Sequence, residues 1–178
     1  RDSFTGGAVS LTTGEGTTDT SGAVVIKTMN AGTSGVSGML SFTSGTASSG
    51  TSGHFNLFTG SATNGKGGDF MLSLGSGTTY DGGHIEMTAG LSTAASGGTG
   101  GAVSISTGEG EASSSGAVIV KTLNAGASGV SGTLSFTSGT TSNGGSGKIR
   151  LATGSATNGE GGDIIVSVGK SKTDAGGD

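Results

Sequence analysis

The sequence reads Gly6-Gly7-Ala8-Val9-Ser10-Leu11-Thr12-Thr13-Gly14 close to its first residue, and this pattern returns along the whole chain. A small residue followed by glycine opens each copy, and large apolar residues occupy the fourth and sixth positions. Strict alternation of apolar and polar residues is typical of a strand with one buried face. The stretch therefore predicts a β-strand that contributes two side chains to a core.

The opening pair recurs at nearly constant intervals, and only the interval before Gly100 is clearly longer than the others. The first residues of the pairs are Gly6, Ser21, Ser37, Ser52, Gly67, Gly82, Gly100, Ser115, Ser131, Ser146, Gly161 and Gly176. Gly100 starts the same series as Gly6, so six copies form a super-repeat. Fixed periods of this kind are the sequence signature of solenoids and related repeat architectures. We treat residues 1–178 as a single solenoid segment with super-repeat units 6–99 and 100–178, and we expect it to belong to a longer chain or fibre.

The apolar columns extend through eleven repeats without exception. The fourth position holds Val9, Val24, Leu40, Phe55, Phe70, Ile85, Val103, Val118, Leu134, Ile149 and Ile164, and the sixth holds Leu11, Ile26, Phe42, Leu57, Leu72, Met87, Ile105, Val120, Phe136, Leu151 and Val166. The second half of each repeat contains mainly Gly, Ser, Thr and Ala. We therefore predict an all-β fold, a parallel β-solenoid of flattened 15–16-residue coils with about 11 complete coils.

Glycines at the corners of such coils allow tight turns with positive φ. In the second repeat of each super-repeat the usual ninth-position glycine is replaced by Met29 or Leu123, and we expect a distinct corner there. Coils stacked about 4.8 Å apart would give a rod on the order of 50 Å long. Exposed ends of such a rod favour self-association, end to end or laterally.

Composition excludes several functions. The chain has 41 glycines, no proline, no cysteine and a net charge of −4. The absence of proline is typical of a chain that forms β-sheet throughout, because proline lacks the backbone N–H that the hydrogen bonds of a sheet require. Scattered charges do not resemble the basic face of a nucleic-acid-binding protein. No apolar run approaches the roughly 20 residues of a membrane helix, so we expect no membrane insertion.

Motifs for catalysis and cofactors are incomplete. There is no Gly-x-Ser-x-Gly elbow and no cysteine nucleophile. Gly14-x-Gly16 and Gly108-x-Gly110 lack the third glycine of a dinucleotide fingerprint, and Gly169-Lys170-Ser171 lacks the first glycine of a P-loop. We predict no enzyme activity, no catalytic residues and no cofactor.

One column of polar residues has the composition of a metal site. In a stacked solenoid His54, Asp69 and His84 would be neighbours about 5 Å apart. Two imidazoles with a carboxylate are credible transition-metal ligands. The alternative is a solvated polar ladder. The second super-repeat favours the ladder, because the same column there reads Lys148, Asp163 and Asp178, and lysine does not replace a zinc ligand.

Ice binding is a second functional possibility. It requires short hydroxyl residues at outward positions of successive coils, as at Ser48, Thr63, Thr78 and Thr93. Gly32, Glu111 and Lys172 interrupt this column. A passive role, as a structural repeat segment of an extracellular fibre, sheath, cell wall or adhesin stalk, explains the sequence without such a face.

The stretch Gly100-Gly101-Ala102-Val103-Ser104-Ile105-Ser106-Thr107-Gly108 resembles the Gly/Ser-rich repeat proteins of diatoms and related algae. The resemblance extends over the whole chain and rests on its low-complexity repeats. It implies a secreted, cell-surface or cell-wall component with a structural or adhesive role. It implies no catalytic residues, and the lysine clusters of silica-precipitating peptides are missing here.

Overall fold

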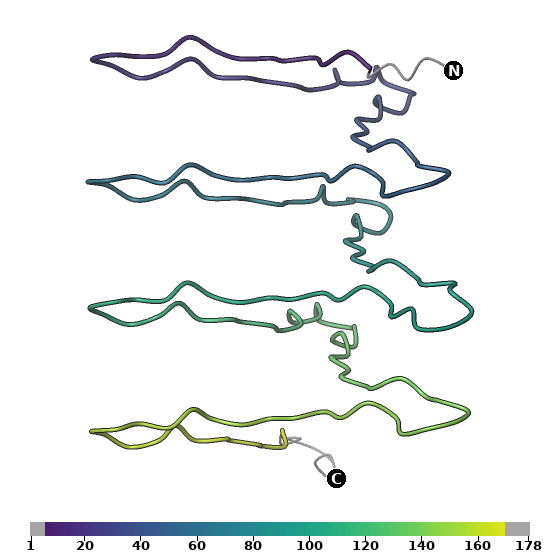
Figure 1. Ribbon diagram of the computed structural model, residues 1–178, viewed down its shortest axis with the longest axis vertical. Coiled ribbons are helices and arrows are strands. Elements are labelled where there is room, and N and C mark those ends of the chain that lie inside the picture. The colour runs from purple at the N-terminus through teal and green to yellow at the C-terminus, as the bar shows by residue number, and fades with distance from the viewer. Residues whose placement is uncertain (1–5, 170–178) are drawn as a thin grey trace. The chain divides into compact units, whose positions relative to one another are not determined.

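The computed structural model describes residues 6–169. Over this range the backbone forms neither a helix nor a β-strand, and Figure 1 accordingly shows a continuous trace without coiled ribbons or arrows. The chain divides into two units, Arg1–Glu86 and Met87–Asp178. The boundary lies inside the sixth repeat, whereas the second super-repeat begins at Gly100.

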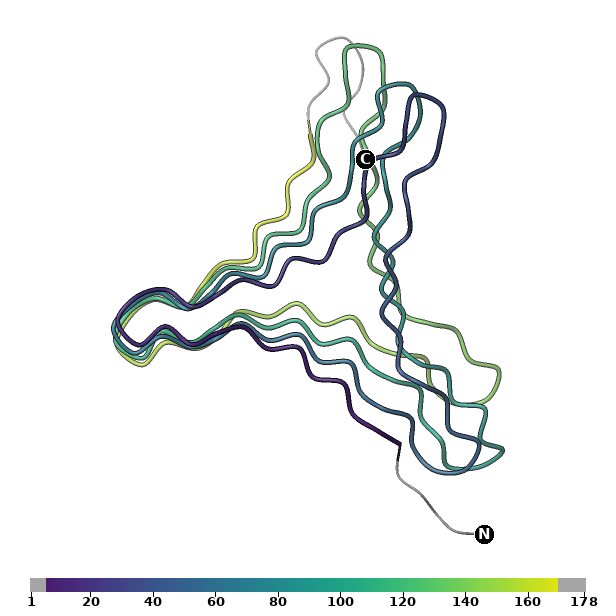
Figure 2. The same ribbon diagram turned by 90° about the horizontal axis from the view of Figure 1, so that it is seen from above.

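The repeat is visible in the backbone as one bend near the end of each copy. Segments without helix or strand connect successive bends, and Figure 2 shows the bends in the trace. The bends occupy residues 17–19, 33–34, 48–50, 63–65, 78–80, 95–97, 111–113, 127–128, 142–144 and 157–159. The sequence period therefore sets where the chain turns.

Each bend brings the eighth position of one repeat against the second-position glycine of the next. A Cβ on that glycine would lie between 3.1 and 3.6 Å from a side-chain carbon of the eighth-position residue. The pairs are Thr13–Gly22, Thr28–Gly38, Ser44–Gly53, Thr59–Gly68, Leu74–Gly83, Ala89–Gly101, Thr107–Gly116, Thr122–Gly132, Ser138–Gly147 and Thr153–Gly162. The second-position glycine thus recurs in these repeats because a neighbouring segment passes close to its Cα.

A backbone hydrogen bond closes several bends at the same positions. The N–H of the second-position glycine donates to the carbonyl of the ninth-position glycine that precedes the bend. Distances run from 2.8 Å for Gly101 to Gly90 to 3.3 Å for Gly68 to Gly60. The others are Gly22 to Gly14, Gly83 to Gly75 and Gly116 to Gly108, each 3.2 Å.

The bend after the second repeat differs, as its sequence predicts. Met29 occupies the position of the ninth-position glycine, and the closing bond comes from a side chain instead. The Thr28 hydroxyl donates to the Gly38 carbonyl oxygen at 3.0 Å. A threonine at the eighth position therefore performs the role that the backbone N–H performs at the bends described above.

Positive φ angles occur at every third bend. Gly50, Gly97 and Gly144 have φ values of 109°, 74° and 115°. Gly97 lies midway in the sequence between Gly50 and Gly144, so this backbone feature has a period of three repeats. The expectation of glycine corners with positive φ is confirmed at these three bends, where residues with a Cβ would be strained.

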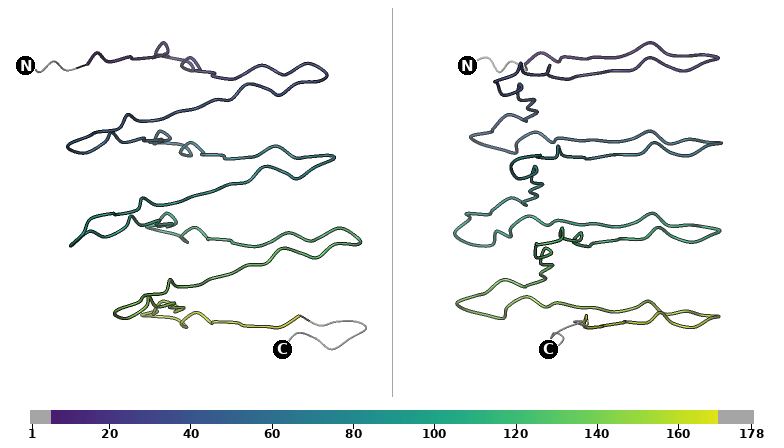
Figure 3. Two further views of the ribbon diagram at one scale, coloured as in Figure 1. Left: turned by 90° about the vertical axis from the view of Figure 1, so that its right-hand side faces the viewer. Right: turned by 180° about the vertical axis from the view of Figure 1, so that it is seen from behind.

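The predicted all-β parallel solenoid is wrong. Residues 6–169 form no sheet, and the two views in Figure 3 likewise show no stacked strands. In a solenoid a residue faces its equivalent in the next coil. Here Phe42, from the sixth position of its repeat, lies against Phe55, from the fourth position of the next and on the far side of a bend. These neighbouring repeats therefore approach one another in opposite directions and not in parallel register.

The physical reason lies in the composition of the repeat. Glycine loses more conformational freedom on ordering than any other residue. Each repeat offers mainly two large apolar side chains to offset that loss. The alternation of apolar residues predicts a core, yet none of the described residues is buried, and Ala89, Ser92 and Gly110 are the least exposed of them.

Candidate functional site

Apolar side chains on the two arms of a bend form the most clearly organised side-chain cluster. The ring centroids of Phe42 and Phe55 are 6.3 Å apart, with an angle of 29° between the ring planes. This separation lies within the range of favourable aromatic pairs. Phe42 occupies the sixth position of its repeat and Phe55 the fourth position of the next, so the two apolar columns meet across the bend.

Backbone geometry explains why these two positions meet. Ser44 and Gly53 lie against each other next to the bend. Phe42 precedes Ser44 by two positions, and Phe55 follows Gly53 by two positions. Because side chains alternate along an extended chain, both rings lie on the same side of the arms as the contact between Ser44 and Gly53. The glycine contact therefore sets the register, and the register places the aromatic rings together.

The equivalent bend of the second unit has the same register but different side chains. Phe136 and Ile149 occupy the places of Phe42 and Phe55, and Ser138 lies against Gly147 as Ser44 lies against Gly53. A hollow of about 270 Å³ lies here, lined by Phe136, Ile149, Arg150 and Leu151. Where the first unit has the Phe55 ring, the second has Ile149 and an open, mostly apolar recess. The guanidinium of Arg150 lies at the edge of this recess.

Solvent reaches all of these side chains. Phe42 and Phe55 are 58% and 57% exposed despite their contact. Among the large apolar residues that the structure describes, the most covered is Leu74, which is still 42% exposed. The cluster at each bend is therefore a surface feature that another molecule can reach.

The candidate metal column, which the sequence disfavours against a solvated polar ladder, is not assembled. Asp69 forms an ion pair with Lys66, with 2.7 Å between Oδ2 and Nζ, and both side chains are largely exposed. Nowhere in residues 6–169 do three or more His, Asp or Glu side chains lie close enough together to hold a metal ion. His54, Asp69 and His84 therefore do not form such a group, and Asp178 lies outside the described residues.

The repeat pattern does not identify two charged residues of this region. It does not predict the pairing of Lys66 with Asp69, although the two lie close enough in the sequence for an ion pair. Nor does it single out Arg150, which stands where the first super-repeat has Asn56. The constant second-position glycine and the small eighth position were signals for close approach across the bend, and they would have placed Phe42 opposite Phe55.

The described residues include no helix that is long and apolar enough to cross a membrane. No protein-family model matches the chain, and no curated protein and no solved structure matches it either. The residues and geometry described above are therefore the basis for any functional conclusion.

Proposed function

We propose that this chain is a structural repeat segment of an extracellular fibre, sheath, cell wall or adhesin stalk, in which other copies of the chain cover its apolar side chains. One observation carries the proposal. Every large apolar side chain between residues 6 and 169 is exposed, although these side chains recur at fixed positions in every repeat. Exposed apolar surface on this scale marks a site of association.

The exposed area indicates that more than one partner is needed. The chain of 16.6 kDa exposes 17953 Å² of surface. A folded monomer of that mass exposes about 7,600 Å² according to the usual scaling with mass. A typical protein–protein interface buries only about 1,200–2,000 Å² in total. A single dimer contact would leave most of the excess in water, which favours assemblies of many copies.

Copies of the same chain are suitable partners because every repeat presents the same apolar pattern. Any repeat of one copy can therefore pack against any repeat of a second copy. Only 11% of the residues are charged, so charge repulsion between copies is small. The resemblance to Gly/Ser-rich surface proteins of algae supports a location outside the cell.

Ice binding has less support than this structural role. It depends on a flat face of regularly spaced hydroxyl residues, and the described residues form no sheet that would hold Ser48, Thr63 and Thr78 in one plane. The structural role needs no such plane, because it depends only on apolar side chains that other copies can reach.

Sedimentation velocity over a range of concentrations, combined with electron microscopy of the same samples, tests the proposal. We expect a shift from monomer to large assemblies as the concentration rises into the micromolar range, and elongated particles on the grid. A chain that sediments as a monomer at hundreds of micromolar would rule out self-assembly as its function.

A further inference from the structure

The two super-repeats differ, among other positions, in three side chains beside the bends that follow Phe42 and Phe136. Phe55, Asn56 and Phe58 of the first are replaced by Ile149, Arg150 and Ala152 in the second. The first unit therefore carries two aromatic rings where the second carries an aliphatic and a small residue, and an amide side chain where the second carries a guanidinium. A surface with exposed aromatic rings can pack against a surface that has an apolar lining and a cation.

The second unit offers the recess. It is a hollow of about 270 Å³ that is open to solvent. Phe136, Ile149 and Leu151 provide an apolar lining, and Arg150 provides a positive charge at the same place. A phenyl ring fits this lining, since it is apolar and its face attracts a cation.

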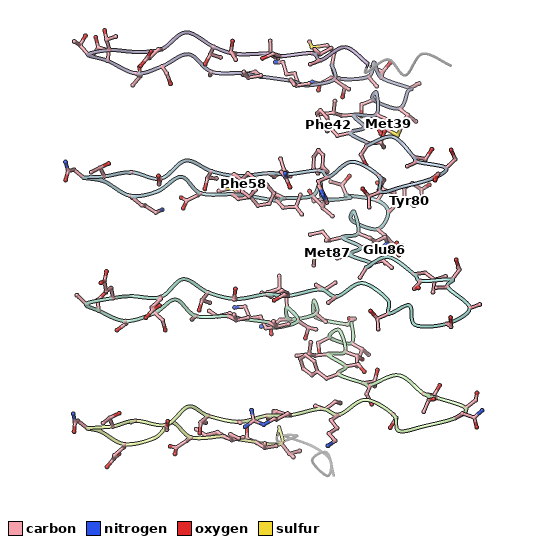
Figure 4. The ribbon with its side chains drawn as sticks, viewed as in Figure 1. Met39, Phe42, Phe58, Tyr80, Glu86 and Met87 are labelled. Atoms are coloured by element: carbon pink, nitrogen blue, oxygen red, sulfur yellow. The ribbon has the colours of Figure 1, made fainter. Side chains whose placement is uncertain are left out.

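The first unit offers the ring. Phe58 is 87% exposed, and it occupies an outward position outside the two apolar columns. Figure 4 shows Phe58 on a different segment from Phe42. Tyr80 is similarly exposed, at 88%, but it lies within the bend at residues 78–80 and not on an arm between two bends.

We propose that the recess beside Phe136 receives the Phe58 ring of a second copy of this chain. This inference rests on the proposed self-assembly and specifies one contact within it. Ring and recess are different surfaces, so each copy can donate a ring to one neighbour and accept a ring from another. Such heterologous contacts continue from copy to copy and lead to open-ended assemblies when they do not close into a ring.

Two substitutions test the contact from its two sides. Phe58→Ala removes the ring and makes the first super-repeat match Ala152 of the second. Ile149→Phe places a ring beside Phe136, as Phe55 lies beside Phe42, and fills the recess. Because aromatic anchors dominate interface affinity, each variant should raise the concentration needed for assembly about tenfold or more. Tyr80→Ala removes an equally exposed ring from the same unit and should leave this concentration within about twofold of wild type.

A mixture of the two variants provides a second readout. The Phe58→Ala chain keeps the recess, and the Ile149→Phe chain keeps the ring. Sedimentation velocity should show a two-chain species in the mixture at concentrations where each variant alone is monomeric. Absence of that species would contradict the contact even if both variants happened to assemble poorly.

Crosslinking identifies the occupant directly. We would place a benzophenone side chain at position 58, mix ¹⁴N and ¹⁵N copies, and locate the crosslinked peptides by mass spectrometry. The proposal predicts crosslinks between the two isotopic populations at residues 136–151. Crosslinks within one population, or to other repeats, would overturn it.

If wild type assembles and both variants assemble equally well, this contact is wrong while the structural function stands. If wild type never assembles, the proposed function itself fails.

Discussion

The bend that joins Phe42 to Phe55 and the bend that joins Phe136 to Ile149 share their backbone register and differ in their side chains. In both, a serine at the eighth position lies against the second-position glycine of the following repeat. In the first, two aromatic rings lie 6.3 Å apart, and in the second an open recess lies beside a single ring. Glycines and small residues thus determine where the arms of a bend meet. The apolar residues determine what the bend presents to another molecule.

The strongest way to break the shared register is to add a side chain to a second-position glycine. Valine in place of Gly22 would place its Cβ about 3.1 Å from the Thr13 Cβ and separate the two arms. This separation is tighter than an ordinary van der Waals contact, so the Thr13 side chain must move away by a few tenths of an ångström. We expect the nuclear Overhauser contacts between residue 13 and residue 22 to disappear. Gly14→Ala is the matched control, because a Cβ at Gly14 meets nothing within 4 Å, and it should keep these contacts.

A smaller change should convert the first bend into the second. Phe55→Ile removes the stacked ring and leaves Phe42 beside an aliphatic residue, as Phe136 lies beside Ile149. An aromatic pair contributes about 0.5–1.5 kcal/mol beyond the area that it buries. We expect the ring-current shifts of the Phe42 protons to vanish, while the contact between Ser44 and Gly53 remains in the same spectra. Loss of both signals would show that the rings, and not the glycines, set the register.

The smallest expected effect concerns the bend that a side chain closes. Thr28→Val removes the hydroxyl that donates to the Gly38 carbonyl and keeps the shape of the side chain. A hydrogen bond of this kind contributes about 0.5–1.5 kcal/mol, and less where water competes at an exposed site. We expect weaker contacts between residues 28 and 38 in the NMR spectra and no change at residues 13 and 22. Thr13→Val should have no effect on its bend, because a backbone bond between Gly22 and Gly14 closes it.

The sequence predicted some local features well. The repeat length matches the spacing of the bends, the replacement of the ninth-position glycine by Met29 indicated a different corner, and glycines with positive φ occur at three bends. These features depend on residues close together in the chain. They follow from the conformational range of glycine and from local hydrogen bonding.

The global arrangement was not predictable from the same pattern. Apolar residues at the fourth and sixth positions indicate that one face is apolar, but they do not reveal which segment lies opposite. A parallel stack would have placed Phe42 near Leu57, whereas the contact between Ser44 and Gly53 places it against Phe55. The metal column and the polar ladder considered for His54, Asp69 and His84 both depended on the parallel stack, so neither has a geometric basis where the arms approach in the opposite direction.

The central claim is that a single copy of this chain buries no apolar side chain over residues 6–169, and that association with other copies covers them. Hydrogen–deuterium exchange, read by mass spectrometry on dilute monomer and on assembled material, tests it most directly. In the monomer we expect amides around the fourth and sixth positions to exchange at nearly unprotected rates, unlike the glycine amides that close the bends, and to become protected on assembly. Strong protection of those repeats in the dilute monomer would contradict the claim, because it would show that one copy alone forms a stable core.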